Sequence, residues 1–266
     1  MPPPIRIENA ADPRIAAYRD IRERDLVGRQ GRFVAEGKVV LRVLFSAARF
    51  EPESALILES RLAGMAEVLA TAPAAMPVYA ASAPVMDAVA GFAIHRGVLA
   101  IGRRRAADYP AGLLAALPER AVVVVLAGIS NHDNVGAIFR NAAGFGAAGV
   151  LLDAASCDPL YRKAIRVSAG AVLKLPYAVG PDAATLRSAL AAAGFVQLAL
   201  SPSGSEDVRN LARPARLALW LGSEGDGLPA SLLAELQSVR IAMAPGFDSL
   251  NVAAASAVAL HHFYAA

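Results

Sequence analysis

The stretch Ala121-Val122-Val123-Val124-Val125-Leu126-Ala127-Gly128 is one of the two longest apolar runs in this chain of 266 residues. Its β-branched valines predict a buried strand. From this run to the C-terminus, short apolar segments alternate with segments of helical periodicity. Such alternation is typical of a parallel sheet that helices cover on both faces, so the sequence predicts an α/β fold.

The expected elements of this half can be placed by residue number. Strands are expected at residues 122–126, 149–152, 173–177, 195–200, 217–221 and 239–242, and helices at residues 135–145, 158–167, 182–193, 229–237 and 249–264. In open parallel sheets, ligands bind outside the carboxyl ends of the strands. We therefore expect a site at that edge of the sheet.

Three polar segments follow strands in this otherwise apolar half. They are Asn134-Val135-Gly136-Ala137-Ile138-Phe139-Arg140, Leu221-Gly222-Ser223-Glu224-Gly225-Asp226-Gly227-Leu228 and Gly246-Phe247-Asp248-Ser249-Leu250-Asn251-Val252. Taken alone, each could be a helix cap or a tight turn. None has the glycine fingerprint or the lysine of a nucleotide-binding loop. Their joint occurrence at strand ends indicates a site.

The first part of the chain predicts a smaller mixed α/β unit. Strands are expected at residues 31–37, 55–58, 77–80 and 98–101, and helices at residues 39–48, 61–70 and 83–89, after a charged, partly periodic segment at 16–27. Arg103-Arg104-Arg105 and the passage Tyr109-Pro110-Ala111-Gly112 follow, which indicates a connection between domains. We expect a domain at 1–106, a linker at 107–119 and a second domain at 120–266.

Charge and composition limit the classes of function. The net charge is +3, and the excess of basic residues lies wholly within residues 1–108, where arginine greatly outnumbers lysine. The planar guanidinium suits phosphate, so this distribution is a weak indication of nucleic-acid binding. The arginine preference of a GC-rich genome would give the same composition.

Cysteine, histidine and hydrophobic patterning give expectations about location and metals. Cys157 is the single cysteine, and no apolar run approaches the ~20 residues of a membrane span. The N-terminus has no apolar segment of the kind that secretion signals contain. His95, His132, His261 and His262 do not have metal-ligand spacing. We expect a cytoplasmic protein with no metal and no membrane association.

The order of the three polar segments closely resembles the SpoU/TrmH family of RNA 2'-O-ribose methyltransferases, within the SPOUT superfamily. The resemblance runs from about Ala121 to the C-terminus. It includes Asn131-His132-Asp133 ahead of the first segment, Asn141-Ala142 after it, and Arg166-Val167-Ser168-Ala169-Gly170-Ala171 ahead of Leu175-Pro176. More loosely, Phe33-Val34-Ala35-Glu36-Gly37 and His95-Arg96-Gly97-Val98-Leu99-Ala100 resemble the ribosomal-protein-like RNA-binding domain of many members.

The resemblance implies a deep trefoil knot in the second domain and S-adenosylmethionine bound within it, largely by backbone groups. Glycines in these loops would let the backbone approach the cofactor closely. The implied cofactor-binding residues are Leu200, Gly222, Ile241, Met243, Leu250 and Asn251. The resemblance also implies a homodimer that packs through this domain, with the active site close to the partner subunit.

The resemblance further implies a catalytic set, which consists of Arg140, Asn134, Glu224, Ser249 and Asn251. A guanidinium has a pKa above ~12, so Arg140 suits binding of the adjacent phosphate and stabilisation of the developing alkoxide better than proton abstraction. Glu224 could fix the plane of that guanidinium. The remaining residues would orient the ribose and the methionine end of the cofactor.

The implied substrate is structured RNA, either rRNA or tRNA. The cations expected to hold it are Arg22, Arg24, Arg29, Arg32, Lys38, Arg103, Arg104 and Arg105. Two other functions stay open. A catalytically inactive RNA-binding or ribosome-assembly module would bind no cofactor, and a base methyltransferase on the same scaffold would differ only in the acceptor atom.

One departure from the family pattern concerns the third segment. Ile241-Ala242-Met243 stands where the family usually has Ile-Pro-Met, and Pro245 and Gly246 follow later. The spacing from Ile241 to Ser249 is kept. We therefore expect the cofactor loop to be present, with a different backbone path around Pro245 and Gly246.

Overall fold

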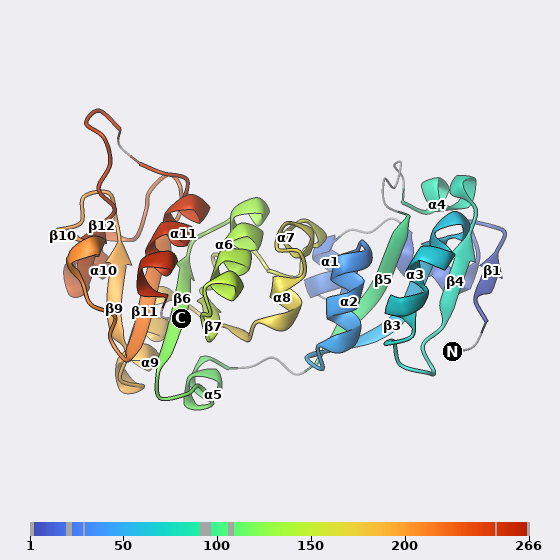
Figure 1. The fold of residues 1–266 in the computed structure, drawn as a ribbon, viewed down its shortest axis with the longest axis horizontal. Coiled ribbons are helices and arrows are strands. Elements are labelled where there is room, and N and C mark those ends of the chain that lie inside the picture. Colours follow the sequence, from blue (N-terminus) through green and yellow to red (C-terminus); the bar gives the residue numbers. More distant parts are fainter. Residues whose placement is uncertain are drawn as a thin grey trace. The chain divides into compact units, whose positions relative to one another are not determined.

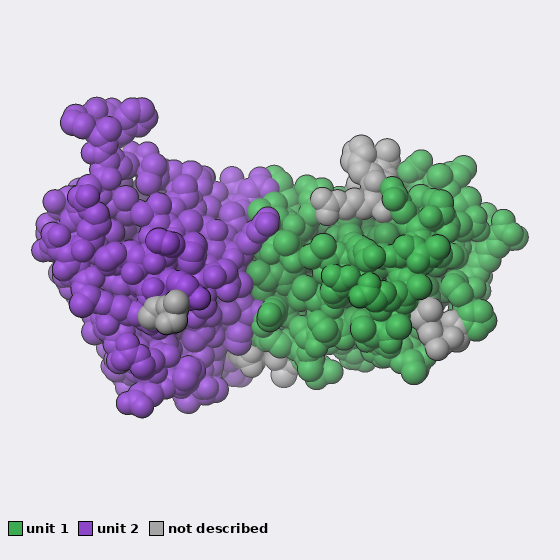
Figure 2. Space-filling model, in the orientation of Figure 1, with its two compact units in different colours: residues 1–106, 158–174 green, residues 107–157, 175–266 purple. Residues whose placement is uncertain are grey.

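The computed structural model describes residues 3–19, 23–28, 30–90, 97–105, 109–247 and 249–264, without the side chains of residues 23–25 and 90. The chain divides into two compact units, which Figure 2 colours separately. Unit 1 consists of residues 1–106 and 158–174, and unit 2 of residues 107–157 and 175–266.

Unit 1 is built on a mixed sheet with strand order β1-β4-β3-β5-β2, of which Figure 1 labels β1, β3, β4 and β5. Its strands are β1 (Ile5–Ile7), β2 (Arg32–Glu36), β3 (Phe50–Leu58), β4 (Val78–Ala81) and β5 (Val98–Arg104). The β1 and β3 strands run parallel to β4, whereas β5 is antiparallel to β2 and β3. Its helices are η1 (Pro13–Tyr18), α1 (Glu23–Gly28), α2 (Lys38–Ser46), η2 (Glu59–Arg61), α3 (Leu62–Leu69), α4 (Ala83–Ala90), α7 (Arg162–Val167) and α8 (Ala171–Lys174). The predicted mixed α/β class is confirmed.

The segment 158–174 differs from its expected place in the second domain. Helix α7 contacts β2, and α8 contacts α2. Ile165 and Val172 are fully buried there, and Gly170, at φ 86°, brings its backbone against Val43. These buried contacts explain why this segment groups with residues 1–106.

Unit 2 is built on a seven-stranded sheet with the order β10-β12-β9-β11-β6-β7-β8, in which every adjacent pair is parallel. Its strands are β6 (Ala121–Ala127), β7 (Gly149–Leu152), β8 (Tyr177–Val179), β9 (Val196–Leu200), β10 (Glu206–Asp207), β11 (Arg216–Gly222) and β12 (Gln237–Arg240). Its helices are α5 (Pro110–Ala115), α6 (His132–Gly144), α9 (Ala183–Ala192), η3 (Val208–Asn210), α10 (Ala230–Glu235) and α11 (Val252–Phe263). The prediction of a largely parallel α/β domain is confirmed.

Several boundaries in unit 2 differ from those expected. The expected strand at 173–177 is wrong, because α8 continues to Lys174 and β8 begins only after Pro176, which has no amide hydrogen for the ladder. Strand β10, at two residues, is too short to show periodicity. The expected linker contains α5, whose Leu113 and Leu114 pack into the core of unit 2.

The site-bearing segments meet at one edge of this core. Val123, Val125 and Trp220 are completely buried in the centre of the sheet. The strands β6, β11 and β12 lead at their carboxyl ends into the three polar segments. Helices α6 and α11 lie side by side, as Figure 1 shows. No helix in the described ranges is long and apolar enough to cross a membrane.

Candidate active site

A cavity of about 580 Å³ lies at the carboxyl ends of β9, β11 and β12. Three loops and the start of α11 enclose it. The lining residues are Leu200, Ser201, Pro202, Ser203, Leu221, Gly222, Ser223, Glu224, Gly225, Asp226, Gly227, Leu228, Leu233, Ile241, Met243, Ser249, Leu250, Asn251, Val252 and Ala255. All the residues predicted to bind the cofactor are in this lining, as are the predicted catalytic residues Glu224, Ser249 and Asn251.

The lining has a distinctive chemistry. It contains aliphatic side chains and two carboxylates, those of Glu224 and Asp226. No lysine, arginine or histidine is among the described residues that line it. Such a cavity suits a ligand that has both an apolar, flat part and a positive charge. It is poorly suited to a ligand that carries several phosphates.

Asn134, Glu224 and Asn251 form a hydrogen-bonded cluster beside this cavity. Asn134, buried in the first turn of α6, donates its side-chain amide to Glu224 Oε1. Asn251 donates from Nδ2 to the same oxygen at 3.0 Å and to Asn134 Oδ1 at 3.1 Å. Asn134 and Asn251 are 117 residues apart in sequence. The structure therefore brings together one residue from each of the three polar segments.

Asn251 has a second function in the same position. Its Oδ1 accepts hydrogen bonds from the backbone amides of Ala253 at 2.9 Å and Ala254 at 3.3 Å, which makes it the N-cap of α11. The side chain thus stabilises the helix with its oxygen and the cluster with its nitrogen. A simple cap and a site residue, which the sequence left as alternatives, are here the same side chain.

Further hydrogen bonds connect α6 and α11, the two helices that carry Asn134 and Asn251. Asn141 of α6 donates from Nδ2 to the carbonyl of Ala253 at 2.8 Å and to Ser256 Oγ at 3.0 Å. Ser256 is completely buried. These bonds fix the position of α11 relative to α6, and hence of Asn251 relative to Asn134.

Asp153 is a supporting residue that sequence reasoning missed. This buried carboxylate, directly after β7, accepts hydrogen bonds from the Gly128 amide at 3.0 and 3.1 Å and from Ser156 Oγ at 2.7 Å. Ser156 Oγ in turn accepts from the amide of Ile129. The turn that leads from β6 to α6 is thereby anchored. The only sequence signal was an acidic residue at the end of the expected strand 149–152.

Gly222 is required by the loop itself. A Cβ on Gly222 would lie 2.3 Å from both the carbonyl carbon of Gly227 and the amide nitrogen of Leu228. The loop closes on itself there, since the Gly227 amide donates to the Ser223 carbonyl at 3.1 Å and Gly227 has φ 70°. The sequence had attributed these glycines to close approach of a cofactor, but at Gly222 the close approach is between two parts of the backbone.

Arg140 is exposed on α6 and is not part of the cavity lining. It lies six residues after Asn134, which corresponds to about 9 Å along the helix axis and about 240° around it. Glu224, expected to orient this guanidinium, instead bonds to Asn134 and Asn251. The expected Arg140–Glu224 pair is therefore not formed within the described part of one chain.

The predicted RNA-binding cations belong to unit 1. Arg22 and Arg29 lie outside the described residues, as does the side chain of Arg24. Arg32 and Arg103 both form ion pairs with Glu53, and Arg104 pairs with Asp158 at 2.6 Å. Lys38 donates to the Gly64 carbonyl at 2.7 Å, and Arg105 is exposed. Their RNA-binding function stays a prediction.

No group of three or more histidine, cysteine, aspartate or glutamate side chains in the described ranges could hold a metal ion.

Comparison with known families gives a match over the second half of the chain. Residues 121–261 match the model of the SpoU rRNA Methylase family. A protein of Mycobacterium bovis named as an uncharacterized tRNA/rRNA methyltransferase is 40% identical over 260 residues, which cover 94% of this chain and 88% of the relative. A 23S rRNA (guanosine-2'-O-)-methyltransferase of Xanthomonas campestris is 29% identical over 66% of this chain and 72% of its own.

Solved structures match the fold along almost the whole chain. An AdoMet-bound rRNA methyltransferase of Sinorhizobium meliloti superposes with a TM-score of 0.79 at 24% identity, over 97% of both chains. A structure described as an RNA 2'-O ribose methyltransferase gives a TM-score of 0.78 at 26% identity, over 97% of this chain and 98% of that one.

Proposed function

The chain belongs to the SpoU rRNA Methylase family, and on that premise we propose that it transfers a methyl group from S-adenosylmethionine to a ribose 2'-hydroxyl of rRNA or tRNA. The observation that carries this proposal is the cavity beside the Asn134–Glu224–Asn251 cluster, because its lining contains all the expected cofactor-binding residues. The names of the Xanthomonas relative and of the 2'-O ribose methyltransferase structure support the ribose hydroxyl as acceptor.

The residues of the cavity fit the cofactor. When bound, S-adenosylmethionine supplies an electrophilic methyl group on a positively charged sulfur. The carboxylates of Glu224 and Asp226 would favour that charge, and the side chains of Leu200, Ile241 and Leu250 offer apolar surface for the adenine. The trefoil knot implied by the resemblance stays a prediction.

In the proposed reaction the ribose O2' would take the methyl group, S-adenosylhomocysteine would leave as the second product, and the hydroxyl proton would pass to solvent water. A 2'-hydroxyl is a poor nucleophile, so a positive group beside it accelerates the step by stabilising the developing alkoxide. We assign this role to Arg140, through the adjacent phosphate. Asn134, Glu224, Ser249 and Asn251 would orient the ribose and the reacting methyl group.

The protein is further proposed to act as a homodimer that packs through α6 and α11. Arg140 and Val258 are exposed on these adjacent helices, and Val258 retains 45% of its accessible surface. Within one subunit Arg140 is outside the cavity lining. A dimer through this face would let Arg140 act at the cavity of the partner subunit.

Two assignments complete the proposal. Unit 1, excluding residues 158–174, is proposed as the RNA-binding domain, since the basic excess of the chain lies in it. The cytoplasm is the proposed location, because rRNA and tRNA are the proposed substrates.

The substitution Arg140→Ala tests the function. We expect it to abolish methyl transfer to RNA and to leave S-adenosylmethionine affinity within a few-fold, measured by titration calorimetry. Equal turnover by this variant would overturn the assignment of Arg140. If Arg140 acts across a dimer interface, mixing Arg140→Ala and Glu224→Ala subunits will restore part of the activity.

The two alternative functions give different results in the same assays. Absence of binding at near-millimolar S-adenosylmethionine would favour an RNA-binding or ribosome-assembly module. Methylated bases in place of 2'-O-methylated nucleosides, identified by mass spectrometry of digested RNA, would favour a base methyltransferase.

A further inference from the structure

One wall of the cavity is a short loop that lies directly against β12. This loop, residues 201–205, follows β9 and contributes Ser201, Pro202 and Ser203 to the lining. The Ser201 amide donates to the Val239 carbonyl at 2.9 Å, and the Gly204 amide donates to the Ser201 carbonyl at 3.0 Å. The loop is therefore a closed turn attached to the strand.

The approach of this loop to β12 is as close as a backbone permits. A Cβ on Gly204 would lie 2.3 Å from the carbonyl carbon of Val239 and 2.6 Å from the amide nitrogen of Arg240. Ser205 adds two bonds to Ser238, one from its amide at 3.2 Å and one from its hydroxyl to the carbonyl at 3.1 Å. Any widening of this contact would move the wall of the cavity.

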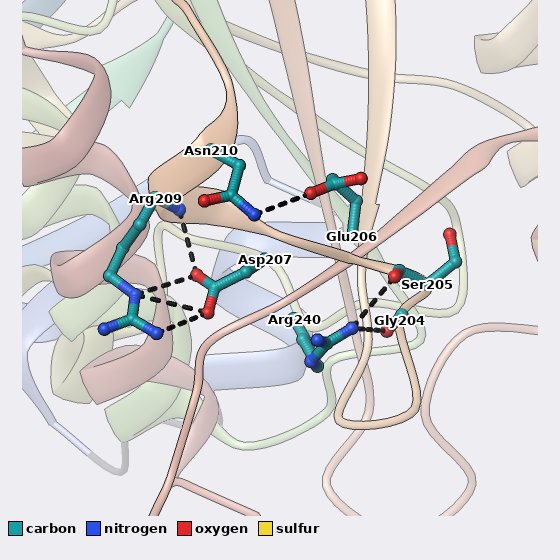
Figure 3. A network of polar contacts seen from close by, with 7 residues as sticks. All are labelled: Gly204, Ser205, Glu206, Asp207, Arg209, Asn210 and Arg240. Carbon is teal, nitrogen blue, oxygen red and sulfur yellow. Dashed lines mark hydrogen bonds and ion pairs between the residues drawn. The ribbon is translucent and has the colours of Figure 1, made fainter.

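Arg240 closes the same contact with its side chain. Its Nη1 donates to the carbonyl oxygen of Gly204 at 2.8 Å and to that of Ser205 at 2.9 Å, as Figure 3 shows. The next residue in the chain, Ile241, also lines the cavity. One side chain thus connects the loop after β9 with the start of the loop after β12.

A nearby carboxylate, that of Asp207, forms its hydrogen bonds with Arg209. Asp207 accepts hydrogen bonds from Arg209 Nη2 at 2.7 Å, from Nε at 3.1 and 3.2 Å, and from the backbone amide of Arg209 at 3.0 Å (Figure 3). The pKa of Asp207 is lowered to about 2, chiefly by the hydrogen bonds from Arg209, with a smaller contribution from the charge of Arg240. The hydrogen bonds that we find for Arg240 go to backbone carbonyls.

We infer that Arg240 is a positioning residue for the cofactor: it holds the wall formed by residues 201–203 at the spacing from Ile241 that S-adenosylmethionine requires. This inference rests on the proposed function for the identity of the ligand. Hydrogen bonds from charged donors are among the stronger ones, so two from one nitrogen add substantially to the bonds that Ser201 and Ser205 make to β12. Loss of Arg240 would leave both carbonyls without that donor and loosen the loop.

The test compares Arg240→Met with Arg240→Lys and with the matched control Arg209→Met. Arg209 belongs to the same network but has an exposed side chain that does not bond to the wall. We expect Arg240→Met to raise both the Kd and the KM for S-adenosylmethionine at least tenfold, with the KM for RNA and the kcat within about threefold. Arg240→Lys should recover part of the affinity, because an ammonium can reach one carbonyl. Arg209→Met should stay within twofold.

Amide hydrogen exchange in the ligand-free protein gives a readout that does not depend on activity. The amide hydrogens of Ser201, Gly204 and Ser205 should exchange faster in the Arg240→Met variant than in the Arg209→Met variant. An unchanged Kd in Arg240→Met, or equal loss in Arg209→Met, would overturn the inference. If the wild-type protein binds no S-adenosylmethionine, the proposed function fails. Unchanged exchange of these amides in Arg240→Met would separately show that Arg240 does not hold the loop.

Discussion

Two polar networks lie at the cavity of unit 2, and they differ in what they are made of. The first joins the side chains of Asn134, Glu224 and Asn251 to one another. The second joins the side chain of Arg240 to the backbone carbonyls of Gly204 and Ser205. The first network places amide and carboxylate groups beside the cavity, where we propose that they orient the reacting groups, whereas the second joins a loop in the cavity wall to β12. We expect loss of the first to lower turnover far more than it lowers cofactor affinity, and loss of the second to act mainly on cofactor affinity and stability.

Glu224→Ala is the change with the largest expected effect. It removes the acceptor shared by the amides of Asn134 and Asn251. We expect kcat to fall by about 100- to 1000-fold, as for the loss of a group that stabilises a transition state. The measurement is single-turnover methyl transfer, with S-adenosylmethionine affinity measured in parallel.

Glu224→Gln is the control for that variant. The glutamine keeps an acceptor oxygen and removes the charge, so it separates the arrangement of the cluster from its electrostatics. If Glu224→Ala weakened cofactor binding and left kcat unchanged, the two networks would not differ in the way we describe.

Gly204→Ala should have an effect of intermediate size, and we expect it to lower the stability of the fold. The added methyl group would overlap the Val239 backbone, which cannot move without disturbing β12. We expect a loss of about 1–3 kcal/mol in the free energy of unfolding, measured by urea denaturation. Gly225→Ala is the matched control, since nothing lies within 4 Å of its Cβ position. Equal stability of the two variants would show that the wall contact is not tight.

Asn251→Ala should have the smallest effect on stability while still reducing turnover. Loss of the N-cap of α11 typically costs about 1 kcal/mol. Asn251→Ser restores a capping oxygen but has no amide to donate to Glu224. We therefore expect the serine variant to regain stability, in thermal unfolding, without regaining kcat. Joint recovery of both would mean that Asn251 serves only as a cap.

The sequence singled out the residues of the first network, though not the bonds between them, and gave no sign of the second, for a reason that concerns the groups involved. Asn, Glu and Ser at strand ends are visible as unusual residue types, and a known family has them in the same order. Carbonyl acceptors such as those of Gly204 and Ser205 exist at every residue, so no pattern distinguishes the ones that a side chain will use. Arg240 was visible only as one more arginine.

The expected Arg140–Glu224 pair is not formed within the described part of one chain, and the reason is geometric. Both residues stand out in the sequence as polar residues within the three segments, but their pairing depends on the direction of each side chain. Helix geometry turns Arg140 away from Asn134, and the amides of Asn134 and Asn251 occupy the carboxylate. Residue type predicted the participants, and packing decided the partners.

By itself the sequence determined the parallel sheet, because short apolar runs such as 121–128 alternate with helical segments. It also determined the edge at which the three polar segments would meet. Tertiary structure alone decided that residues 158–174 join unit 1. It also decided that Arg240 would bond to a loop more than 30 residues away. Burial patterns are local and repeat along the chain, so a sequence displays them. Contacts between distant segments depend on which surfaces meet after the chain has folded.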